Sequence, residues 1–244
     1  MQERRVVKAD SSARSELEAR GWVVIARSWG AGLTVDDASH PRLSALRDGV
    51  EPLVTVRELE PADVDAVLAL DRETLDDYPG DVATAHEALT EARATPTPDH
   101  RGWGAFAHDA HLVAMTFVDI GREVVETDFT VVRRGWRGQG LGSAVKSASV
   151  LALSEQGHVR FRTGGSMDNP ASIAANRAVG YERDEEWLTF VADGEGLRGR
   201  PVRADGAGRS NGDDDTDSRD PTRILRRAGR TAQLGRSVGM IVPW

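Results

Sequence analysis

One segment constrains the fold of this chain more than any other, and it runs from Thr130 to Lys146 with the sequence TVVRRGWRGQGLGSAVK. A β-branched run is followed by a glycine-rich turn, and an amphipathic helical pattern begins directly after the turn. Glycines let the backbone approach a ligand closely, and the first amides of a helix have no partners within the helix. The segment therefore predicts a phosphate site at a helix N-terminus, where Arg134 and Arg137 add positive charge.

Two common phosphate-binding motifs do not fit this turn. A dinucleotide-binding turn needs G-x-G-x-x-G, but the spacing from Gly138 places Ser143 at the last position. A P-loop needs glycine before its lysine, and here Val145 precedes Lys146. Both motifs are therefore excluded by the residues present.

The spacing that does fit is R-x-x-G-x-G, which here is RGQGLG at residues 137–142. This pattern resembles the acetyl-coenzyme A loop of the GNAT superfamily of N-acetyltransferases. A second segment, from Asn169 to Glu182, is similar to the family's N-x-x-[AS]-x-x-x-[YN]-x-x-x-G-[FY] pattern. The resemblance covers about residues 51–192, and residues 193–244 take no part in it.

Hydrophobic periodicity agrees with an α+β fold over this region. Strand and helix patterns from about Val54 to Val191 follow the order β-α-α-β-β-β-α-β-α-β, with the second helix expected at about 84–94. The resemblance implies a GNAT-like mixed central sheet with flanking helices. In such folds the cofactor lies in the wedge between two splayed parallel strands.

Composition divides the chain into three parts. Residues 1–50 are expected to form an N-terminal extension with a short helix and a strand, and residues 51–192 the acetyltransferase-like domain. Residues 193–244 combine an acidic, glycine-rich linker with an arginine-rich tail, and the linker is too polar to bury a core, so disorder is expected. A short basic helix at about 222–234 is expected to be a loosely attached tail, or an arm that contacts RNA or another protein.

The resemblance implies which residues hold acetyl-coenzyme A. Backbone groups of the strand are expected to pair with the pantetheine, the turn amides to hold the pyrophosphate, and an asparagine to reach the pantetheine or the thioester. These cofactor-binding residues are Thr130, Val131, Val132, Arg137, Gly138, Gln139, Gly140, Leu141, Gly142, Ser143 and Asn169.

The catalytic residues are less clearly marked. Many family members place a tyrosine seven residues after the motif's asparagine, as general acid for the departing thiolate. Here that position is Asn176, which is expected to orient the sulfur or the acyl carbonyl, or only to pack. Alternation puts Glu126, Asp128 and Thr130 on one strand face, where adjacent carboxylates raise one another's pKa. Either carboxylate is a candidate base for the attacking amine, or both bind the substrate's ammonium instead.

Composition limits the remaining classes of function. The net charge of −8 disfavours nucleic-acid binding through a basic surface, and the absence of cysteine excludes disulfides, thiolate metal sites and a cysteine nucleophile. The six histidines lack a metal-binding spacing, so no metal site is expected. No stretch is apolar enough for a secretory signal or a membrane span, so a cytoplasmic protein is expected.

The sequence and the resemblance together predict an N-acetyltransferase. It would transfer an acetyl group from acetyl-coenzyme A to a primary amine by direct attack in a ternary complex, because no nucleophile for a covalent intermediate stands out. The acidic strand face favours a cationic acceptor. The alternative is a non-catalytic acyl-coenzyme A-binding sensor or interaction module, because the tyrosine is missing and the chain carries long tails.

Overall fold

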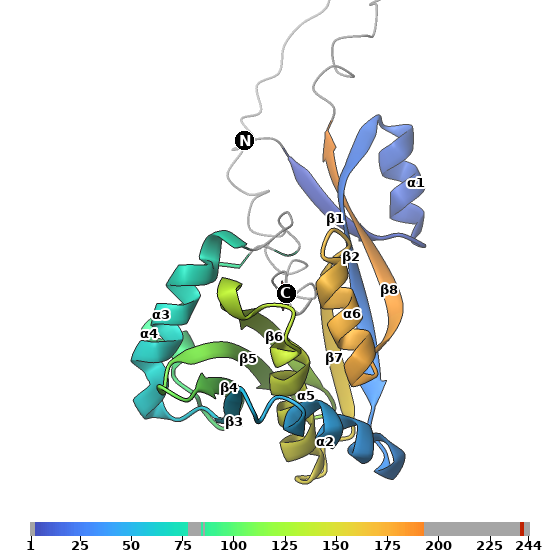
Figure 1. Ribbon diagram of the computed structural model, residues 1–244. Coiled ribbons are helices and arrows are strands. Elements are labelled where there is room, and N and C mark those ends of the chain that lie inside the picture. Colours follow the sequence, from blue (N-terminus) through green and yellow to red (C-terminus); the bar gives the residue numbers. More distant parts are fainter. Residues whose placement is uncertain (1–2, 78–83, 85, 193–239, 242–244) are drawn as a thin grey trace, which may run out of the picture. The chain divides into compact units, whose positions relative to one another are not determined.

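A mixed sheet with helices on both faces forms the core of this protein (Figure 1). The structure, a computed structural model, describes residues 3–77, 84, 86–192 and 240–241. The strands of this part of the chain are β1 Arg4–Lys8, β2 Trp22–Thr34, β3 Val54–Glu58, β4 His100–Ala107, β5 Leu112–Ile120, β6 Val125–Val132, β7 Arg160–Ser166, β8 Glu182–Ala192 and β9 Met240–Ile241. The helices are α1 Ser12–Ala19, α2 His40–Asp48, α3 Val64–Thr74, α4 Glu91–Ala94, α5 Leu141–Ser154 and α6 Pro170–Val179.

The strand order is β1-β8-β2-β7-β6-β5-β4-β3, and β9 pairs with β6 off this path. Neighbouring strands are antiparallel except at β6, which pairs in parallel with both β7 and β9. The α+β fold class with a mixed central sheet is confirmed.

Helices cover both faces of the sheet, and the two faces hold different cores. One core joins α5 and α6 with the strands from β2 to β7, and another joins α3 and α4 with β4, β5 and β6. Almost every residue of α5 is buried, since α2, α6 and the sheet surround it. This explains why apolar and small residues occur on nearly every side of α5, with Lys146 as its one charged residue, instead of along one stripe.

Local sequence signals fix the ends of the two helices beside the site. Gly140 is the N-cap of α5, and its φ of 80° is the left-handed conformation that glycine adopts readily. Asn169 is the N-cap of α6, where its side chain accepts a hydrogen bond from the Ser172 amide, and Pro170 follows in the first turn. Gly180 then ends α6 in the left-handed conformation.

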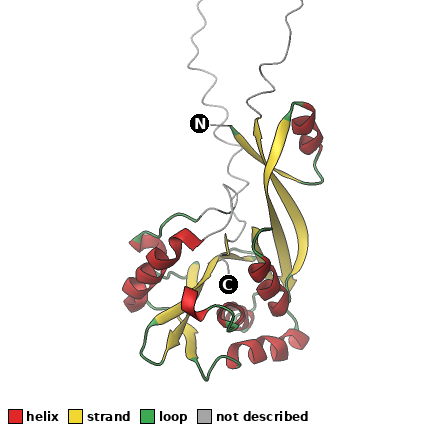
Figure 2. Ribbon diagram, turned by 45° about the horizontal axis from the view of Figure 1, so that its top comes forward, coloured by secondary structure: helices red, strands yellow, loops and turns green. Residues whose placement is uncertain are grey.

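The N-terminal residues differ from the expectation of a separate extension. β2 lies between β7 and β8 and pairs with both, so residues before 51 form the middle of the sheet. Trp29 on β2 is 2% exposed, and its indole nitrogen donates to the Ser166 carbonyl on β7 at 3.2 Å. Beyond this region β1, β2 and β8 extend past the other strands, where α1 packs on them through Leu17 (Figure 2).

Three further expectations have different outcomes. The helix expected at 84–94 is limited to Glu91–Ala94, because Thr90 caps the Arg93 amide and the described residues 86–90 are not helical. The expected basic helix at 222–234 and most of the expected disordered segment lie outside the described residues. Met240 and Ile241 are exceptions, because they form β9. Among the described residues, no helix is long and apolar enough to cross a membrane.

The position of β2 predicts that the domain needs its N-terminal residues to fold. We expect residues 1–192 to unfold in one cooperative thermal transition. We expect residues 51–192 to lack such a transition, because β7 and β8 lose their shared neighbour and the core loses Trp29. Circular dichroism and calorimetric melting would measure this difference. A cooperative transition of 51–192 at a similar temperature would contradict the prediction.

Candidate functional site

The candidate site is an opening in the sheet between β6 and β7. These strands pair at Val125 with Phe161 and at Glu126 with Arg162, and no later pair joins them within the described residues. Beyond Glu126 and Arg162 the strands diverge, and we call this opening the wedge. Backbone groups of β6 that face the wedge must find partners other than β7.

A β-bulge shapes the β6 side of the wedge. Phe117 and Val118 on β5 pair with Phe129 and Thr127, so Asp128 is an extra residue without an opposite partner. The bulge breaks the alternation of the strand. The expectation that Thr130 shares a face with Glu126 and Asp128 is therefore wrong.

Side-chain contacts confirm this change of face. The Thr130 hydroxyl lies 2.7 Å from the Thr116 hydroxyl, and Val132, two residues later, belongs to the core that includes α5. Asp128 instead pairs with Arg93 of α4, on the opposite face. The two carboxylates Glu126 and Asp128 thus lie on the face that carries α3 and α4.

Two residues near the C-terminal end of the chain, Met240 and Ile241, lie in the wedge. β9 pairs in parallel with β6, with Met240 opposite Phe129 and Ile241 opposite Thr130, and it also contacts β7. Thr130 is one of the residues expected to pair with the pantetheine. The same strand edge can therefore accept either an added strand or another ligand with amide groups.

The glycine-rich turn lies at the open end of the wedge, because β6 leads into it directly. Gly138 and Gly140 have φ values of 76° and 80°. A Cβ at Gly138 would meet no atom within 4 Å, and one at Gly140 would meet only Val50 at 3.9 Å. Space on the outer side of the turn is thus open, and the first amides of α5 follow immediately. This geometry suits an anion such as a pyrophosphate.

Two arginines beside the turn share one carboxylate. Arg134 and Arg137 both pair with Asp77, and Arg137 also donates to the Val132 carbonyl at 3.1 Å. Burial acts to raise the pKa of Asp77, but the two arginines outweigh it and hold the pKa below its usual value. Asp77 therefore keeps its charge, and the three side chains together retain one positive charge beside the turn.

The two asparagines of α6 serve the helix itself. Asn169 is buried, and its Oδ1 accepts from the Ser172 amide at 3.0 Å. Asn176 is also buried, and its Nδ2 donates to the Ser172 carbonyl at 2.9 Å. No described residue donates to Oδ1 of Asn176. A buried acceptor without a donor is costly, so this atom is suited to a ligand that brings an N–H group.

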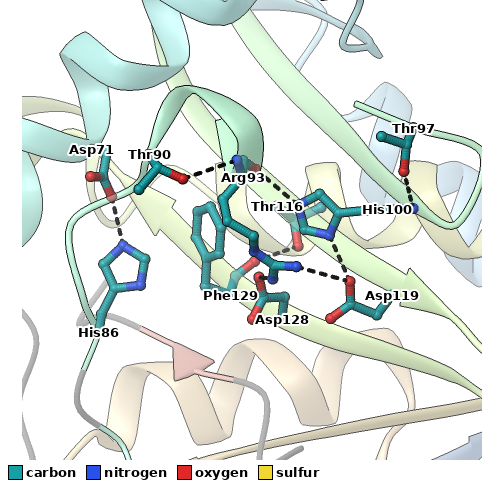
Figure 3. Close-up of polar contacts among 10 residues, drawn as sticks. All are labelled: Asp71, His86, Thr90, Arg93, Thr97, His100, Thr116, Asp119, Asp128 and Phe129. Carbon is teal, nitrogen blue, oxygen red and sulfur yellow. Dashed lines mark hydrogen bonds and ion pairs between the residues drawn. The ribbon is translucent and has the colours of Figure 1, made fainter. Parts of the chain in front are cut away.

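A charged network occupies the face of the sheet that carries α3 and α4 (Figure 3). The guanidinium of Arg93 pairs with Asp128 and lies 3.7 Å from Asp119. Nδ1 of His100 lies 2.6 Å from the same Asp119 carboxylate, and its Nε2 lies 3.0 Å from the Arg93 carbonyl. The Asp128 carboxylate therefore already has a cationic partner within the protein.

His100, Asp119 and Asp128 also meet the distance requirement for a metal site. Their ligand atoms lie within 4.8 Å of one another. Arg93, however, already supplies positive charge between the two carboxylates. The donor set is satisfied by protein groups, so it does not fit a metal ion.

A second histidine and carboxylate pair lies close to this network. Nε2 of His86 lies 2.6 Å from Oδ1 of Asp71, whose other oxygen accepts from the Leu89 amide at 2.9 Å. Both side chains are almost fully buried. The His86 ring lies 4.9 Å from the Phe129 ring, next to the bulge (Figure 3).

Sequence reasoning missed four side chains beside the wedge, which are His86, Arg93, His100 and Lys146. The histidines and Arg93 lie in the segment that was expected to be a helix and a loop, where no periodic pattern predicts their partners. Lys146 lies on α5 and donates to Thr127 of β6 and Thr163 of β7. A lysine in an apolar helix was a signal that could have been recognised.

Comparisons with known proteins agree with this geometry. No protein-family model matches the sequence, and no curated protein matches it. Among solved structures, a GCN5-related N-acetyltransferase from Sphaerobacter thermophilus is similar with a TM-score of 0.56 at 16% identity, covering 77% of this chain and 58% of that one. A tandem GNAT protein from the clavulanic acid biosynthesis pathway has a TM-score of 0.55 at 21% identity, covering 78% and 62%. A GCN5-related N-acetyltransferase from Kribbella flavida has a TM-score of 0.52 at 17% identity, covering 79% and 69%.

The chain has the fold of the GCN5-related N-acetyltransferases, the GNAT superfamily. The resemblance inferred from the RGQGLG turn is thereby confirmed for the fold. The chain spans 58% and 62% of the length of the first two of these structures. At these identities the likeness establishes the architecture, and activity and substrates belong to the proposal that follows.

Proposed function

We propose that this protein is an N-acetyltransferase. It transfers the acetyl group of acetyl-coenzyme A to a primary amine, which attacks the thioester directly in a ternary complex. One observation carries the proposal, namely that β6 and β7 separate after two pairs and that β6 then enters a glycine turn at the start of α5. The fold shared with GCN5-related N-acetyltransferases supports the same activity.

The proposed seat of acetyl-coenzyme A follows from this geometry. The pyrophosphate binds the amides of residues 138–143 at the open side of the turn, next to Arg137. Its negative charge competes with Asp77 for the Arg137 guanidinium. The pantetheine extends the sheet along Thr130, Val131 and Val132. Oδ1 of Asn176 accepts an N–H group of the pantetheine, while Asn169 keeps α6 in position beside the wedge.

The proton of the attacking amine goes to a carboxylate on the face that carries α3 and α4. Glu126 is favoured over Asp128, because it belongs to the last β6–β7 pair, at the closed end of the wedge. Asp128, Asp119 and the Asp71–His86 pair make this face acidic, which suits a cationic acceptor. An amide side chain does not titrate, so Asn176 binds the pantetheine and does not transfer a proton.

A non-catalytic acyl-coenzyme A sensor is the second candidate. It is favoured by β9, which lies on the strand edge where the pantetheine would bind. A thiol-release assay with acetyl-coenzyme A and a panel of primary amines separates the two functions. Release that depends on the amine supports the transferase, whereas calorimetric binding without release supports the sensor.

Gly140→Asp tests the phosphate part of the site. We expect the affinity for acetyl-coenzyme A to fall by about 100-fold or more, equivalent to about 2.7 kcal/mol, because a carboxylate would meet the pyrophosphate. Gly157→Asp is a matched control, since Gly157 also has a positive φ of 93° and an open Cβ position at the far end of α5. Calorimetry that gives equal affinity for wild type and Gly140→Asp would exclude this turn as the site.

Removal of residues 237–244 tests whether β9 competes with acetyl-coenzyme A. We expect the shortened protein to bind acetyl-coenzyme A several-fold more tightly, because the backbone of Phe129 and Thr130 becomes accessible. The peptide SVGMIVPW, added to the shortened protein, should weaken binding again. An unchanged dissociation constant in both measurements would show that β9 and the cofactor do not share the wedge.

Glu126→Gln tests the proposed proton acceptor. We expect turnover to fall by roughly 100-fold or more while the affinity for acetyl-coenzyme A changes little. The acidic limb of the pH–rate profile should shift or vanish, because only the ionised carboxylate accepts a proton. Asp128→Asn, in contrast, should mainly raise the Michaelis constant of a cationic acceptor. Wild-type turnover and pH dependence in both variants would exclude each carboxylate as an essential base.

A further inference from the structure

One lysine is buried at the closed end of the wedge. Lys146 is 1% exposed, and its Nζ donates to the hydroxyl of Thr127 at 3.3 Å and to that of Thr163 at 3.1 Å. These threonines directly follow Glu126 and Arg162, which form the last β6–β7 pair. The amino group therefore bridges the two strands at the point where they begin to diverge.

The surroundings of Lys146 provide little charge compensation. No carboxylate of the described residues lies within salt-bridge distance of it, and the Tyr181 ring, 5.3 Å away, is its aromatic neighbour. Glu126 and Arg162 precede the two threonines, so alternation turns them to the other face of the sheet. α2, which packs against α5, carries Arg42, and the guanidinium of Arg42 lies beside Gly180.

This environment destabilises the charged form of the amine. Burial lowers the pKa of Lys146 from its usual value to about 7. Ammonium and free amine are therefore both populated near neutral pH, which is the condition for a group that gives up and regains a proton in each cycle.

The residue type at position 146 also agrees with a group that gains and loses a proton. Lysine and arginine together number 31 in this chain, and only Lys8 and Lys146 are lysines. An apolar residue at this buried position would avoid the desolvation of an amine, and an arginine would never release its proton. Lysine is the basic residue that combines a positive charge with a proton it can lose.

On the basis of the proposed function, we propose that the Lys146 ammonium is the general acid that protonates the thiolate of coenzyme A as it departs. The pyrophosphate lies at the open end of the wedge, and the pantetheine runs along β6 toward the closed end. The sulfur is therefore carried toward Thr127 and Thr163, where Nζ is held.

The reaction balances with the groups named. The amine nitrogen attacks the thioester carbon, the carbon–sulfur bond breaks, and the electron pair of that bond stays on sulfur. Sulfur takes a proton from Nζ, and Glu126 takes the proton that the amine loses. Solvent then returns a proton to Lys146 from Glu126, so the products are the amide and coenzyme A thiol.

Other polar groups at the closed end are weaker acids. Burial raises the pKa of the Tyr181 phenol above its usual value, although its hydrogen bond with Thr127 opposes this. The threonine hydroxyls do not titrate in this range. A thiol has a pKa of about 8.5, so transfer from the Lys146 ammonium to a thiolate is favourable.

Lys146→Met in the full chain tests the proposal. The measured quantity is kcat/KM for acetyl-coenzyme A, taken as the ratio of wild type to variant from pH 5.5 to pH 9. This ratio cancels the titration of Glu126 and of the amine. We expect it to be roughly 100 or more at pH 6, and to fall about tenfold per pH unit above pH 7 as the ammonium is lost. A ratio near one at pH 6, or a ratio that stays constant from pH 5.5 to pH 9, would overturn the proposal.

Two controls separate proton transfer from structure. Lys8→Met replaces the exposed lysine and should leave kcat/KM unchanged. Lys146→Met should be more stable than wild type at pH 6, because the folded protein disfavours the ammonium. This difference in stability should shrink as the pH rises from 7 to 10.5, because folded wild type then holds the neutral amine and no longer buries an ammonium. Lys146→Gln serves as a second neutral variant with the same expected ratio.

Two further outcomes bear on the proposal. A stable acetyl group on Lys146, detected by mass spectrometry after turnover, would show that the amine is an acceptor and would overturn its role as acid. If wild type releases no coenzyme A with any amine, the proposed function itself fails, and the role of Lys146 fails with it. An active wild type with a pH-independent ratio rejects Lys146 alone.

Discussion

The brief parallel pairing of β6 and β7 is the constraint on which the site depends. Two pairs, at Val125 and Glu126, hold the strands together, and the backbone of β6 beyond them must form hydrogen bonds with something else. β9 meets this need at Phe129 and Thr130. Because β6 continues directly into the glycine turn, the same divergence also places the N-terminus of α5 at the open end. The location of the site is thus decided by backbone geometry.

The side chains around the wedge are divided between the two faces of the sheet. Carboxylates and histidines gather on the face with α3 and α4, and each carboxylate of the Arg93 network has a cationic or histidine partner. On the face with α5, the Lys146 amine lies among hydroxyls and apolar groups at the closed end, away from the Arg101–Glu58 ion pair on β4 and β3. The carboxylates and the Lys146 amine thus lie on opposite faces of the sheet at the closed end of the wedge, where they do not neutralise each other.

The sequence predicted those parts of the fold that depend on local chemistry. The turn around Gly140 and the helix after it follow from residues a few positions apart, and the structure agrees with them. The cap of α6 was not predicted, because Asn169 was expected to reach the cofactor. The bulge at Asp128 was not predictable, because alternation along one strand carries no information about its partner β5. The start of α4 was predicted too early for a related reason, since its limits depend on Thr90 and on the distant Asp71. The order of the strands could not be predicted from the sequence either, because β2 pairs with residues more than a hundred positions away.

The insertion of β2 has a consequence for how the protein is made. Gly30 pairs with Gly164 on β7, and Trp22 pairs with Ala192 on β8, so the first long strand must wait for β7 and β8. At about 5–20 residues per second, the ribosome needs on the order of ten seconds to deliver those partners. During that time Val23, Val24 and Ile25 form an apolar β-prone stretch without its neighbours. The pairing of β2 is therefore expected to wait until β8 has been made, and nascent β2 is the segment most in need of chaperone protection.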